Sequence, residues 1–217
     1  MENKIIKNDA ETMPIPPFTD GSPTKLIIGT FPPHIDKWDY KFFFPNHVNR
    51  IWRTLGKVAY DECYELLHNN DEEAVNERKQ ILLKLNSAMV NIIYSCKRNE
   101  KKSALDNDLE IVGELHNIID EILRPYQNIT SIYLTSSSGK NSCVSLLKKH
   151  LNEHGINLNT KSSEKDRAGK IANPLIDTIE FEGRKIKVYS LFSPSPTAQR
   201  RGITEDILLQ QYKIIQS

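Results

Sequence analysis

A short apolar strand that runs into a proline turn constrains this sequence more than any other feature. Residues 25–30 read Lys-Leu-Ile-Ile-Gly-Thr, and residues 31–33 read Phe-Pro-Pro. An apolar run bounded by glycine and proline is typical of a fully buried strand. The aromatic run 42–44 follows, and then the polar residues 46–49 at the start of a helical pattern. In α/β folds, ligand sites form where a buried strand ends and a helix begins, so we expect a site here.

Strand and helix patterns alternate along the rest of the chain. This alternation predicts an α/β protein, a three-layer α/β/α sandwich with a mainly parallel central sheet. Apolar residues at helical spacing predict a first helix over about 46–60, with Asn46 as its N-cap. Further strands are predicted at 91–94 and 130–135, a hairpin at 177–181 and 185–192 with its turn at Glu182-Gly183, and further helices around 82–89, from 143 to Gly155, and after a Thr204 cap.

One more helix is predicted from a capping motif. Ser103 to Asp106 matches the capping box, in which a serine and an acidic residue three positions later satisfy the first free amides of a helix. The residues after it place apolar side chains on one helical face, namely Leu109, Val112, His116, Ile119 and Leu123. We therefore assign Ser103 and Asp106 to helix capping.

The length of 217 residues and the composition predict a soluble chain with one core. Hydrophobic residues make up 38% and charged residues 26%. We expect an N-terminal arm over residues 1–24, which contain four prolines, and a single domain over 25–217. No apolar run is long enough to span a bilayer, and residues 1–13 lack the apolar stretch of a signal peptide. We therefore expect a cytoplasmic monomer with no membrane partner.

Charge and cysteine content exclude several kinds of site. The chain has 29 basic and 28 acidic residues, so any contact with nucleic acid must come from a local basic patch. The candidates are residues 97–102, 161–170 and 199–201. The three cysteines, Cys63, Cys96 and Cys143, form no C-x-x-C pair, and we expect reduced, mostly buried thiols. His34 and His47 belong to no spaced set of metal ligands, so we expect no metal and no organic cofactor.

Two common catalytic motifs are absent from the sequence. Gly139-Lys140 does not form a P-loop, because Leu134 occupies the position of its first glycine and Asn141 that of its serine or threonine. The chain has no G-x-S-x-G elbow, so the serine hydrolases that use this motif are excluded. The free backbone amides at a helix start are the expected content of the Gly139 region.

Two other segments each allow two interpretations. The run Phe42 to Phe44 either fills the core beneath a loop or offers a ring face to a planar ligand such as a nucleobase. The segment Ser193 to Thr197 follows a predicted strand and is stiffened by two prolines. It is either an ordinary rigid loop or a site whose hydroxyl and amide groups bind phosphate, with Arg200 and Arg201 just beyond it.

Four segments in one order along the chain match a known set of motifs. Residues 29–33 resemble G-x-x-P-G, and the following His34 adds a likeness to G-Q-D-P-Y-H. Residues 43–52 resemble Y-Y-A-N-P-R-N-x-F-W, residues 95–98 with 103–106 resemble S-C-x-R and G-S-L-D-S, and residues 191–198 resemble L-P-S-T-S-P-A-N. Together they are similar to the uracil-DNA glycosylase superfamily, and most similar to its hypoxanthine-DNA glycosylase branch.

The resemblance implies an activity and a set of site residues. It implies a monofunctional DNA glycosylase that hydrolyses the N-glycosidic bond of a deaminated base, hypoxanthine or uracil, flipped out of duplex DNA in base excision repair. Asn46 would position the water or contact the base, and Phe44 would stack on the base. The implied base pocket comprises Gly29, Thr30, Phe31, Pro32, Pro33, Phe44, Asn49 and Asn91, with Asn91 as a supporting partner. The implied DNA-binding residues are Ser193, Pro194, Ser195, Pro196, Thr197, Gln199, Arg200 and Arg201.

The chain also departs from the family pattern. Phe31 occupies the position of a water-activating Asp or Asn in the best-known members, and a phenyl ring cannot orient water. Pro33 replaces a glycine, and no long apolar wedge follows the Ser-Pro loop, so Thr197, Gln199 or Arg200 would fill the gap left by a flipped base. Two alternatives remain open: a glycosylase-fold protein that binds nucleic acid without hydrolysis, and an enzyme that acts on free nucleosides in the same cleft.

Overall fold

A five-stranded sheet forms the middle layer of the molecule. The computed structural model describes residues 10–70, 72–100, 103, 105–160 and 173–216. The strand order is β3-β2-β6-β8-β7, with β7 antiparallel to β8 and the other neighbours parallel. The strands are β2 (Lys25–Gly29), β3 (Ser87–Asn91), β6 (Ser131–Leu134), β7 (Leu175–Phe181) and β8 (Arg184–Ser190).

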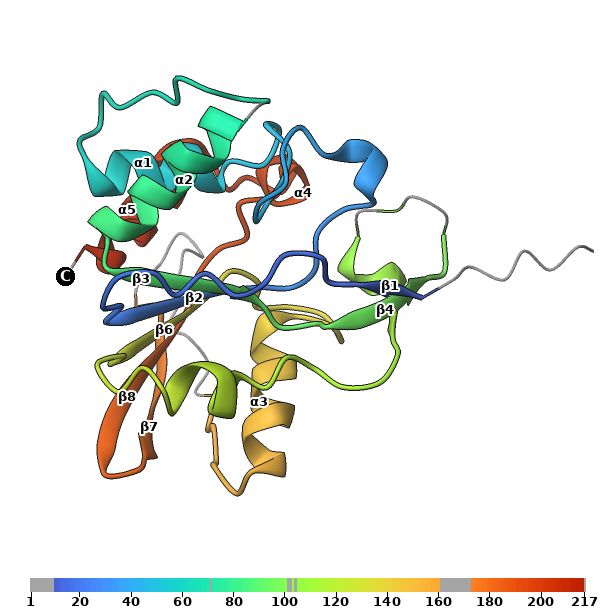
Figure 1. The fold of residues 1–217 in the computed structure, drawn as a ribbon, viewed down its shortest axis with the longest axis vertical. Coiled ribbons are helices and arrows are strands. Elements are labelled where there is room, and N and C mark those ends of the chain that lie inside the picture. Colours follow the sequence, from blue (N-terminus) through green and yellow to red (C-terminus); the bar gives the residue numbers. More distant parts are fainter. Residues whose placement is uncertain (1–9, 71, 101–102, 104, 161–172, 217) are drawn as a thin grey trace, which may run out of the picture.

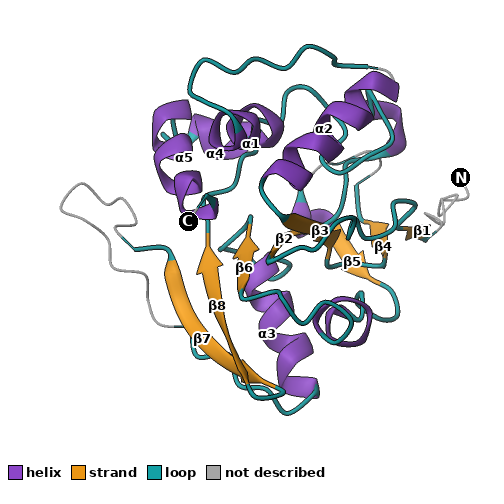
Figure 2. Cartoon of the chain, turned by 60° about the vertical axis from the view of Figure 1, so that its left-hand side comes forward, coloured by secondary structure: helices purple, strands orange, loops and turns teal. Residues whose placement is uncertain are grey.

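Helices cover both faces of this sheet (Figures 1 and 2). One face carries α1 (Ile51–Ala59), α2 (Glu72–Lys84), α4 (Pro196–Arg200) and α5 (Glu205–Tyr212), and the other carries α3 (Cys143–Glu153) and a π-helical turn (Ile119–Leu123). The side chains of β2 serve both cores, because Leu26 and Ile28 pack on the α3 side and Ile27 on the α1 side. The predicted three-layer α/β/α sandwich is confirmed.

A second, smaller sheet lies beyond the β3 edge (Figure 2). It is antiparallel and consists of β1 (Glu11–Thr12), β4 (Ser95–Arg98) and β5 (Leu109–Ile111). The helix predicted after Ser103 is therefore wrong. Residues 109–111 satisfy their backbone groups by pairing with β4, and Gly113 then takes a left-handed φ of 83° that no regular helix contains.

The predicted capping box is also wrong. Ser103 Oγ donates to Asp108 Oδ2, and Leu105 N donates back to Ser103 Oγ at 3.2 Å. The next element is a short 3-10 turn, Asp106–Asp108, whose N-cap position is Leu105 and which has no side-chain cap. Ala104 lies outside the described residues.

Three features that short sequence patterns predicted are confirmed: a hairpin turn, a helix N-cap and a helix end. The β7–β8 hairpin turns at Glu182 and Gly183, both with positive φ (48° and 78°), which matches the right-handed twist of the strands. Thr204 caps α5, since Ile207 N donates to its Oγ1 at 3.3 Å. Gly155 (φ 75°) lies just past the end of α3, where the left-handed conformation stops a helix.

The boundaries of two helices differ from the prediction. The first helix begins at Ile51 and its N-cap position is Arg50, so Asn46 is not the cap. Met89 belongs to β3, because α2 ends at Lys84 and the chain enters the sheet at Ser87. For Met89, the apolar spacing of the sequence fits the strand as well as the helix, whereas residues 46–50 form turns before α1.

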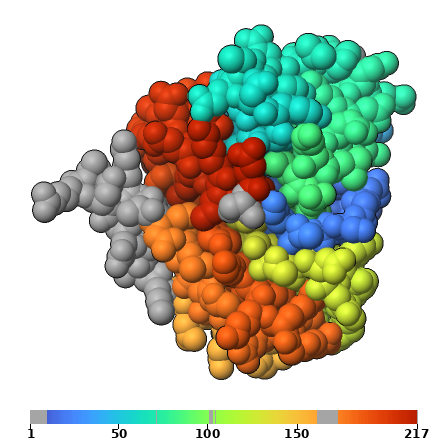
Figure 3. Space-filling model, turned by 90° about the vertical axis from the view of Figure 1, so that its left-hand side faces the viewer, coloured from blue at the N-terminus to red at the C-terminus, as the bar shows by residue number. Residues whose placement is uncertain are grey.

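Residues 10–24 lie against the rest of the molecule. Met13, Ile15 and Phe18 are buried in the core on the α1 side, and Phe18 forms an antiparallel bridge with Met89. The C-terminal helix packs on α1, and the space-filling view shows the last residues (red) against the α1 and α2 segments (Figure 3). Cys96 and Cys143 are buried free thiols, whereas Cys63 is exposed.

Among the described residues, no helix has the length and apolar character needed to cross a bilayer. The basic segment 161–170 and the pair Lys101-Lys102 fall outside the described residues. The division into residues 1–24 and 25–217 stays a prediction.

Candidate functional site

The carboxyl ends of the parallel strands meet at one edge of the sheet. From β2 the chain crosses the α1 side to reach β3 on one flank, whereas β6 pairs with the other flank of β2. Open α/β sheets bind their ligands at the carboxyl strand ends, next to such a reversal of strand order. Four segments end there: Gly29-Thr30 after β2, Asn91 at the end of β3, Thr135-Ser136 after β6, and the chain beyond Ser190.

On the α1 side of this edge, Gly29 is covered by two side chains. A Cβ atom at Gly29 would lie 2.4 Å from Asn91 Oδ1 and 2.9 Å from Phe44 Cζ. Only glycine therefore allows the amide of Asn91 and the ring of Phe44 to approach the strand end together. Asn91 is buried, and its Nδ2 lies 3.7 Å from Met13 Sδ. The structure thus brings three of the predicted base-pocket residues into contact.

The three phenylalanines of the aromatic run have two different environments. Phe42 and Phe43 are core residues, and the ring of Phe42 stacks on Trp52 at 5.7 Å between centroids. Trp52 Nε1 donates to Phe43 O at 2.8 Å, which fixes the backbone just before Phe44. Phe44 itself is half-buried. The core-filling interpretation is thus confirmed for Phe42 and Phe43, while Phe44 reaches the strand end.

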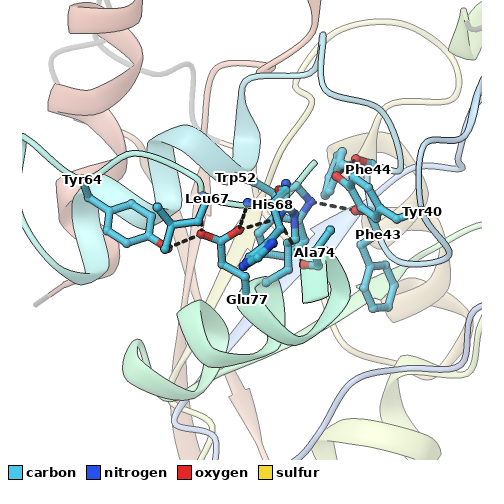
Figure 4. Close-up of polar contacts among 10 residues, drawn as sticks. Tyr40, Phe43, Phe44, Trp52, Tyr64, Leu67, His68, Ala74 and Glu77 are labelled. Atoms are coloured by element: carbon cyan, nitrogen blue, oxygen red, sulfur yellow. Dashed lines mark hydrogen bonds and ion pairs between the residues drawn. The ribbon is translucent and has the colours of Figure 1, made fainter. Parts of the chain in front are cut away.

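The backbone at Phe44 is held in an unusual conformation. Its φ is +49°, a region that costs a residue with a side chain about 1 kcal/mol or more. Tyr40 Oη donates to Phe44 O at 2.7 Å, and burial raises the pKa of Tyr40 to about 12, so this phenol stays a donor at neutral pH. The guanidinium of Arg78 lies over the Tyr40 ring, 4.8 Å from its centroid. Figure 4 shows Tyr40 next to Phe44.

The ion pair between Arg78 and Glu77 connects Tyr40 to α2 (Figure 4). Arg78 is 1% exposed, and its Nη1 donates to Glu77 Oε2 at 2.7 Å and to His68 O at 2.6 Å. Glu77 Oε1 in turn accepts from Tyr64 Oη and from Leu67 N, both at 2.8 Å. The segment 64–68 is thereby fixed on α2, next to the loop that carries Phe44.

Asn46 and Asn49 lie in the turns that lead into α1. Asn49 N donates to Asn46 Oδ1 at 3.2 Å, and Ile51 N donates to Asn49 Oδ1 at 3.0 Å. Both asparagines line a cavity of about 630 Å³, together with residues of α1, the 64–69 segment and Glu205. The residues that line this cavity do not include the strand-end group of Gly29, Asn91 and Phe44. The sequence analysis expected Asn46 and Asn49 at the same pocket as Gly29, Asn91 and Phe44. In the structure both asparagines line this neighbouring cavity, and Asn46 N donates to Phe44 O at 2.9 Å.

Arg50 joins this loop to the Ser-Pro loop. It is 1% exposed, and its guanidinium donates to Ile203 O at 2.6 Å and to Ser195 O at 3.4 Å. Its backbone N also donates to Pro194 O at 3.1 Å. The loop with Asn46 and the loop with Ser195 therefore lie side by side, on the same part of the molecule.

Within the Ser-Pro loop, the serine hydroxyls mainly serve the loop itself. Ser195 caps α4 by accepting from Ala198 N at 3.3 Å, and Ser193 Oγ donates to Ser195 Oγ at 3.0 Å. Pro194 is buried, whereas Pro196 and Thr197 are half-buried. The exposed groups beyond it are Gln199, Arg200 and Arg201.

The backbone carbonyls of the proline turn after β2 accept hydrogen bonds from other side chains of the protein. Arg98 Nη2 donates to Pro32 O at 2.7 Å, Trp38 Nε1 donates to Pro33 O at 2.8 Å, and the Arg98 guanidinium lies 5.6 Å from the centroid of the Phe31 ring. Ile92 N and Ile93 N donate to the carbonyls of residues 29 and 30. These carbonyls can reach a ligand only through their second lone pairs.

One group at this edge was missed by the sequence analysis. Asp106 is half-buried, and its Oδ2 accepts from Thr30 Oγ1 at 3.1 Å. Burial raises the pKa of Asp106 to about 6, against the lowering effects of the Thr30 hydrogen bond and of Arg98. A carboxyl group with a perturbed pKa at the ligand-binding edge of a sheet is a candidate functional group. Asp106 belongs to the segment that resembles G-S-L-D-S, but the sequence analysis assigned it to helix capping.

No group of three or more His, Cys, Asp or Glu side chains that could bind a metal ion occurs in the part of the chain that the structure describes.

The fold is similar to a solved structure from Methanosarcina acetivorans. That structure, determined by solution NMR, is described as "a putative Uracil DNA glycosylase". The TM-score is 0.52, the sequence identity is 12%, and the alignment covers 94% of this chain and 97% of that chain. At this identity the likeness shows the fold alone, so the expected uracil-DNA glycosylase-like architecture is confirmed. No protein-family model and no curated protein matches the sequence.

Proposed function

We propose that this chain is a monofunctional DNA glycosylase that hydrolyses the N-glycosidic bond of a deaminated base, hypoxanthine or uracil, flipped out of DNA in base excision repair. The observation that supports this most is the contact of Phe44 and Asn91 at Gly29, at the carboxyl end of β2. The fold shared with the Methanosarcina protein and the collinear motifs agree with it. The motif likeness favours hypoxanthine, and so the hypoxanthine-DNA glycosylase branch.

The chemistry of the strand-end group suits a flipped base. A phenyl ring offers a face on which a planar base can stack, and an amide can both donate to and accept from the edge of a base. Phe44 and Asn91 are such a ring and amide, and a tightly supported backbone fixes the position of the ring. A site of this kind selects a base by shape and hydrogen bonding, and no metal or cofactor is needed for recognition.

The remaining roles follow the motif likeness. Asn46 would position the water or contact the base at the rim, and Gln199, Arg200 and Arg201 would contact the phosphates beside the flipped nucleotide. Ser193 and Ser195 would hold the shape of that loop, because their hydroxyls already bond within it. The proposal includes a monomer in the cytoplasm that acts on duplex DNA.

A second candidate is a nucleic-acid-binding protein of the same fold without hydrolysis. Phe31 favours it, because this ring packs under Arg98 and cannot orient water.

A cleavage assay on a panel of bases distinguishes the two functions. Duplexes that contain uracil, hypoxanthine or xanthine are incubated with the protein and then heated in alkali, which cleaves the strand at abasic sites. The glycosylase proposal predicts cleavage of at least one substrate and a large loss of cleavage in Asn46→Ala. Salt-dependent binding without cleavage of any substrate would support the non-enzyme instead.

A further inference from the structure

We infer that Asp106 is the general base of the reaction, the carboxylate that accepts the proton of the attacking water. This inference rests on the proposed glycosylase function. It assigns a chemical role that neither Phe31 nor Asn46 can fill, because a phenyl ring cannot bind water and a neutral amide can orient water but cannot take its proton.

Asp106 lies beside the carboxyl end of β2, where ligands of open α/β sheets bind. Its partner Thr30 is the residue directly after Gly29, so the two residues point to opposite faces of the sheet. Gly29 is covered by Phe44 and Asn91, and Thr30 by Asp106. Phe44 and Asp106 therefore flank the end of β2 from its two sides, and the proposal puts the base against Phe44 and its sugar on the Asp106 side.

The turn that carries Asp106 is fixed against the loop after β6. Asn141, which is 3% exposed, donates through Nδ2 to Asp106 O at 2.9 Å and to Leu109 O at 2.6 Å. A Cβ atom at Gly139 would lie 3.0 Å from Asn107 Oδ1, so the turn and the loop are in close contact. Asp106 therefore lies at the carboxyl ends of β2 and β6, the point where the strand order reverses.

A chain of hydrogen bonds runs from α3 to this carboxylate. Cys143 N, at the first residue of α3, donates to Ser136 Oγ at 2.8 Å. The hydroxyls of Ser136 and Thr30 lie 3.3 Å apart, and Thr30 donates to Asp106 Oδ2. Since Thr30 gives its proton to Asp106, Ser136 is the donor between the two hydroxyls. Every donor then points towards Asp106, which together with the positive end of the α3 dipole stabilises the ionised form.

The second carboxylate oxygen is available for a ligand. Among the residues that the structure describes, Asp106 Oδ1 accepts no hydrogen bond. The nearby charged groups have other partners: Arg98 donates to Glu11 Oε1, Ser103 O and Pro32 O, and Asp108 accepts from Ser103. The buried thiol of Cys143 has a raised pKa and stays neutral. Asp106 can therefore exchange a proton near neutral pH, which its pKa of about 6 also favours.

The proposed step balances as follows. The water oxygen forms a bond to C1′ of the sugar as the C1′–N bond breaks, and the electron pair of that bond leaves with the base. The water proton goes to Asp106, and the anionic base takes a proton from solvent. Asp106 then returns its proton to solvent. Before the water attacks, the carboxylate also stabilises the positive charge that develops on the sugar.

The test compares Asp106→Asn with Asp108→Asn, a control in the same turn. Single-turnover cleavage of the preferred base is measured from pH 5 to 9, together with DNA affinity and the Tm of each protein. We expect wild-type rates to rise with pH to a plateau above about pH 6, and Asp106→Asn to lose at least about 100-fold in rate with unchanged DNA affinity and no fall in Tm. Asp108→Asn should keep the wild-type profile. In Thr30→Val the rise should move to higher pH, because the ionised carboxylate loses a donor.

Each outcome bears on a stated claim. If the wild-type protein cleaves and Asp106→Asn keeps a rate within threefold and the same pH profile, the inference about Asp106 is overturned and the proposed function stands. A fall in rate in Asp106→Asn that matches a fall in Tm, with no change in the pH profile, would also overturn it, since a purely structural role predicts that pattern. A wild-type protein that cleaves no base overturns both.

Discussion

At the scale of single residues, the absence of a side chain at Gly29 decides what the site can be. The end of β2 is in contact with an amide and a ring only because no Cβ atom separates them. The backbone of Phe44 is fixed in a conformation with positive φ, because Tyr40 donates to its carbonyl and Trp52 donates to the carbonyl of Phe43. The geometry of the candidate base pocket thus depends on a few backbone positions.

Gly29→Ala should therefore affect activity more than stability. The new methyl group must displace Asn91 and Phe44, whose near atoms are the ends of side chains that can shift. We expect a rate loss of about 100-fold for a displacement near 1 Å, with a loss of about 1–2 kcal/mol in the free energy of unfolding. Single-turnover cleavage and urea unfolding measure the two effects. Thr178→Ala, at an exposed position of β7, is the control, and equal losses of rate in both variants would contradict the account.

Asp106 should also affect how stability depends on pH. Its pKa is raised from 3.8 to about 6 in the folded protein, so between these values the folded state binds more protons than the unfolded state. Its contribution to stability is present below about pH 4 and is lost as the pH rises through 6. The Tm difference between Asp106→Asn and wild type should thus increase in favour of the variant from pH 4 to pH 7. A difference that is constant over this range would contradict the raised pKa.

At the scale of elements, Arg50 couples two loops that are about 145 residues apart in the sequence. Its side chain donates to carbonyls at Pro194, Ser195 and Ile203, and it does so from the N-cap position of α1. These hydrogen bonds hold the Ser-Pro loop against the N-terminus of α1.

Arg50→Met should remove this coupling. Three carbonyls, at one buried and two half-buried residues, would lose a charged donor, and we expect a loss of about 2–4 kcal/mol in the free energy of unfolding. Hydrogen exchange should increase in residues 191–203 and stay unchanged in the β7–β8 hairpin. Arg53→Met is the matched control, because Arg53 is exposed and its 3.7 Å ion pair with Glu205 contributes about 0–1 kcal/mol. Unchanged exchange in residues 191–203 would contradict the proposed role of Arg50.

The elements also show what the sequence can predict. The strand at 25–29, the β7–β8 hairpin and the caps of α3 and α5 depend on neighbours in the sequence, so their patterns predicted them. The helix predicted after Asp106 is wrong at residues 109–111, because pairing with β4, a non-local contact, outweighs the helical spacing; its last part, Ile119–Leu123, is helical. Asp106 was missed for the same reason: its partner Thr30 is 76 positions away. The place of Asn46 and Asn49 at the neighbouring cavity depends on a turn that residue patterns do not specify.

At the scale of the whole molecule, a net charge of +1 gives DNA no general attraction. Binding must come from a local surface, and Gln199, Arg200 and Arg201 provide exposed groups at the end of α4, beside the loops joined by Arg50. Helix α3, with Lys148 and Lys149, lies on the opposite face of the sheet (Figure 2). The account therefore predicts that one face of the molecule binds DNA.

Charge reversal on the two faces tests this prediction. Arg200→Glu with Arg201→Glu should weaken binding of a duplex and reduce the slope of log affinity against log salt by about one for each lost phosphate contact. Lys148→Glu with Lys149→Glu, which makes the same change in net charge on the α3 face, should have a much smaller effect. Fluorescence anisotropy between 50 and 200 mM salt measures both, and equal effects from the two variants would contradict a single DNA-binding face.

The most direct measurement for the central claim is the identity of the products. Duplex DNA with one hypoxanthine or uracil is incubated with the protein, and the released base is quantified by mass spectrometry beside the abasic strand. The account predicts free base and abasic sites in equal amounts, no covalent adduct on borohydride trapping, and loss of both products in Asp106→Asn purified in parallel. If the wild-type protein releases no free base from any deaminated substrate, the claim that the residues at this strand end excise a flipped base is contradicted.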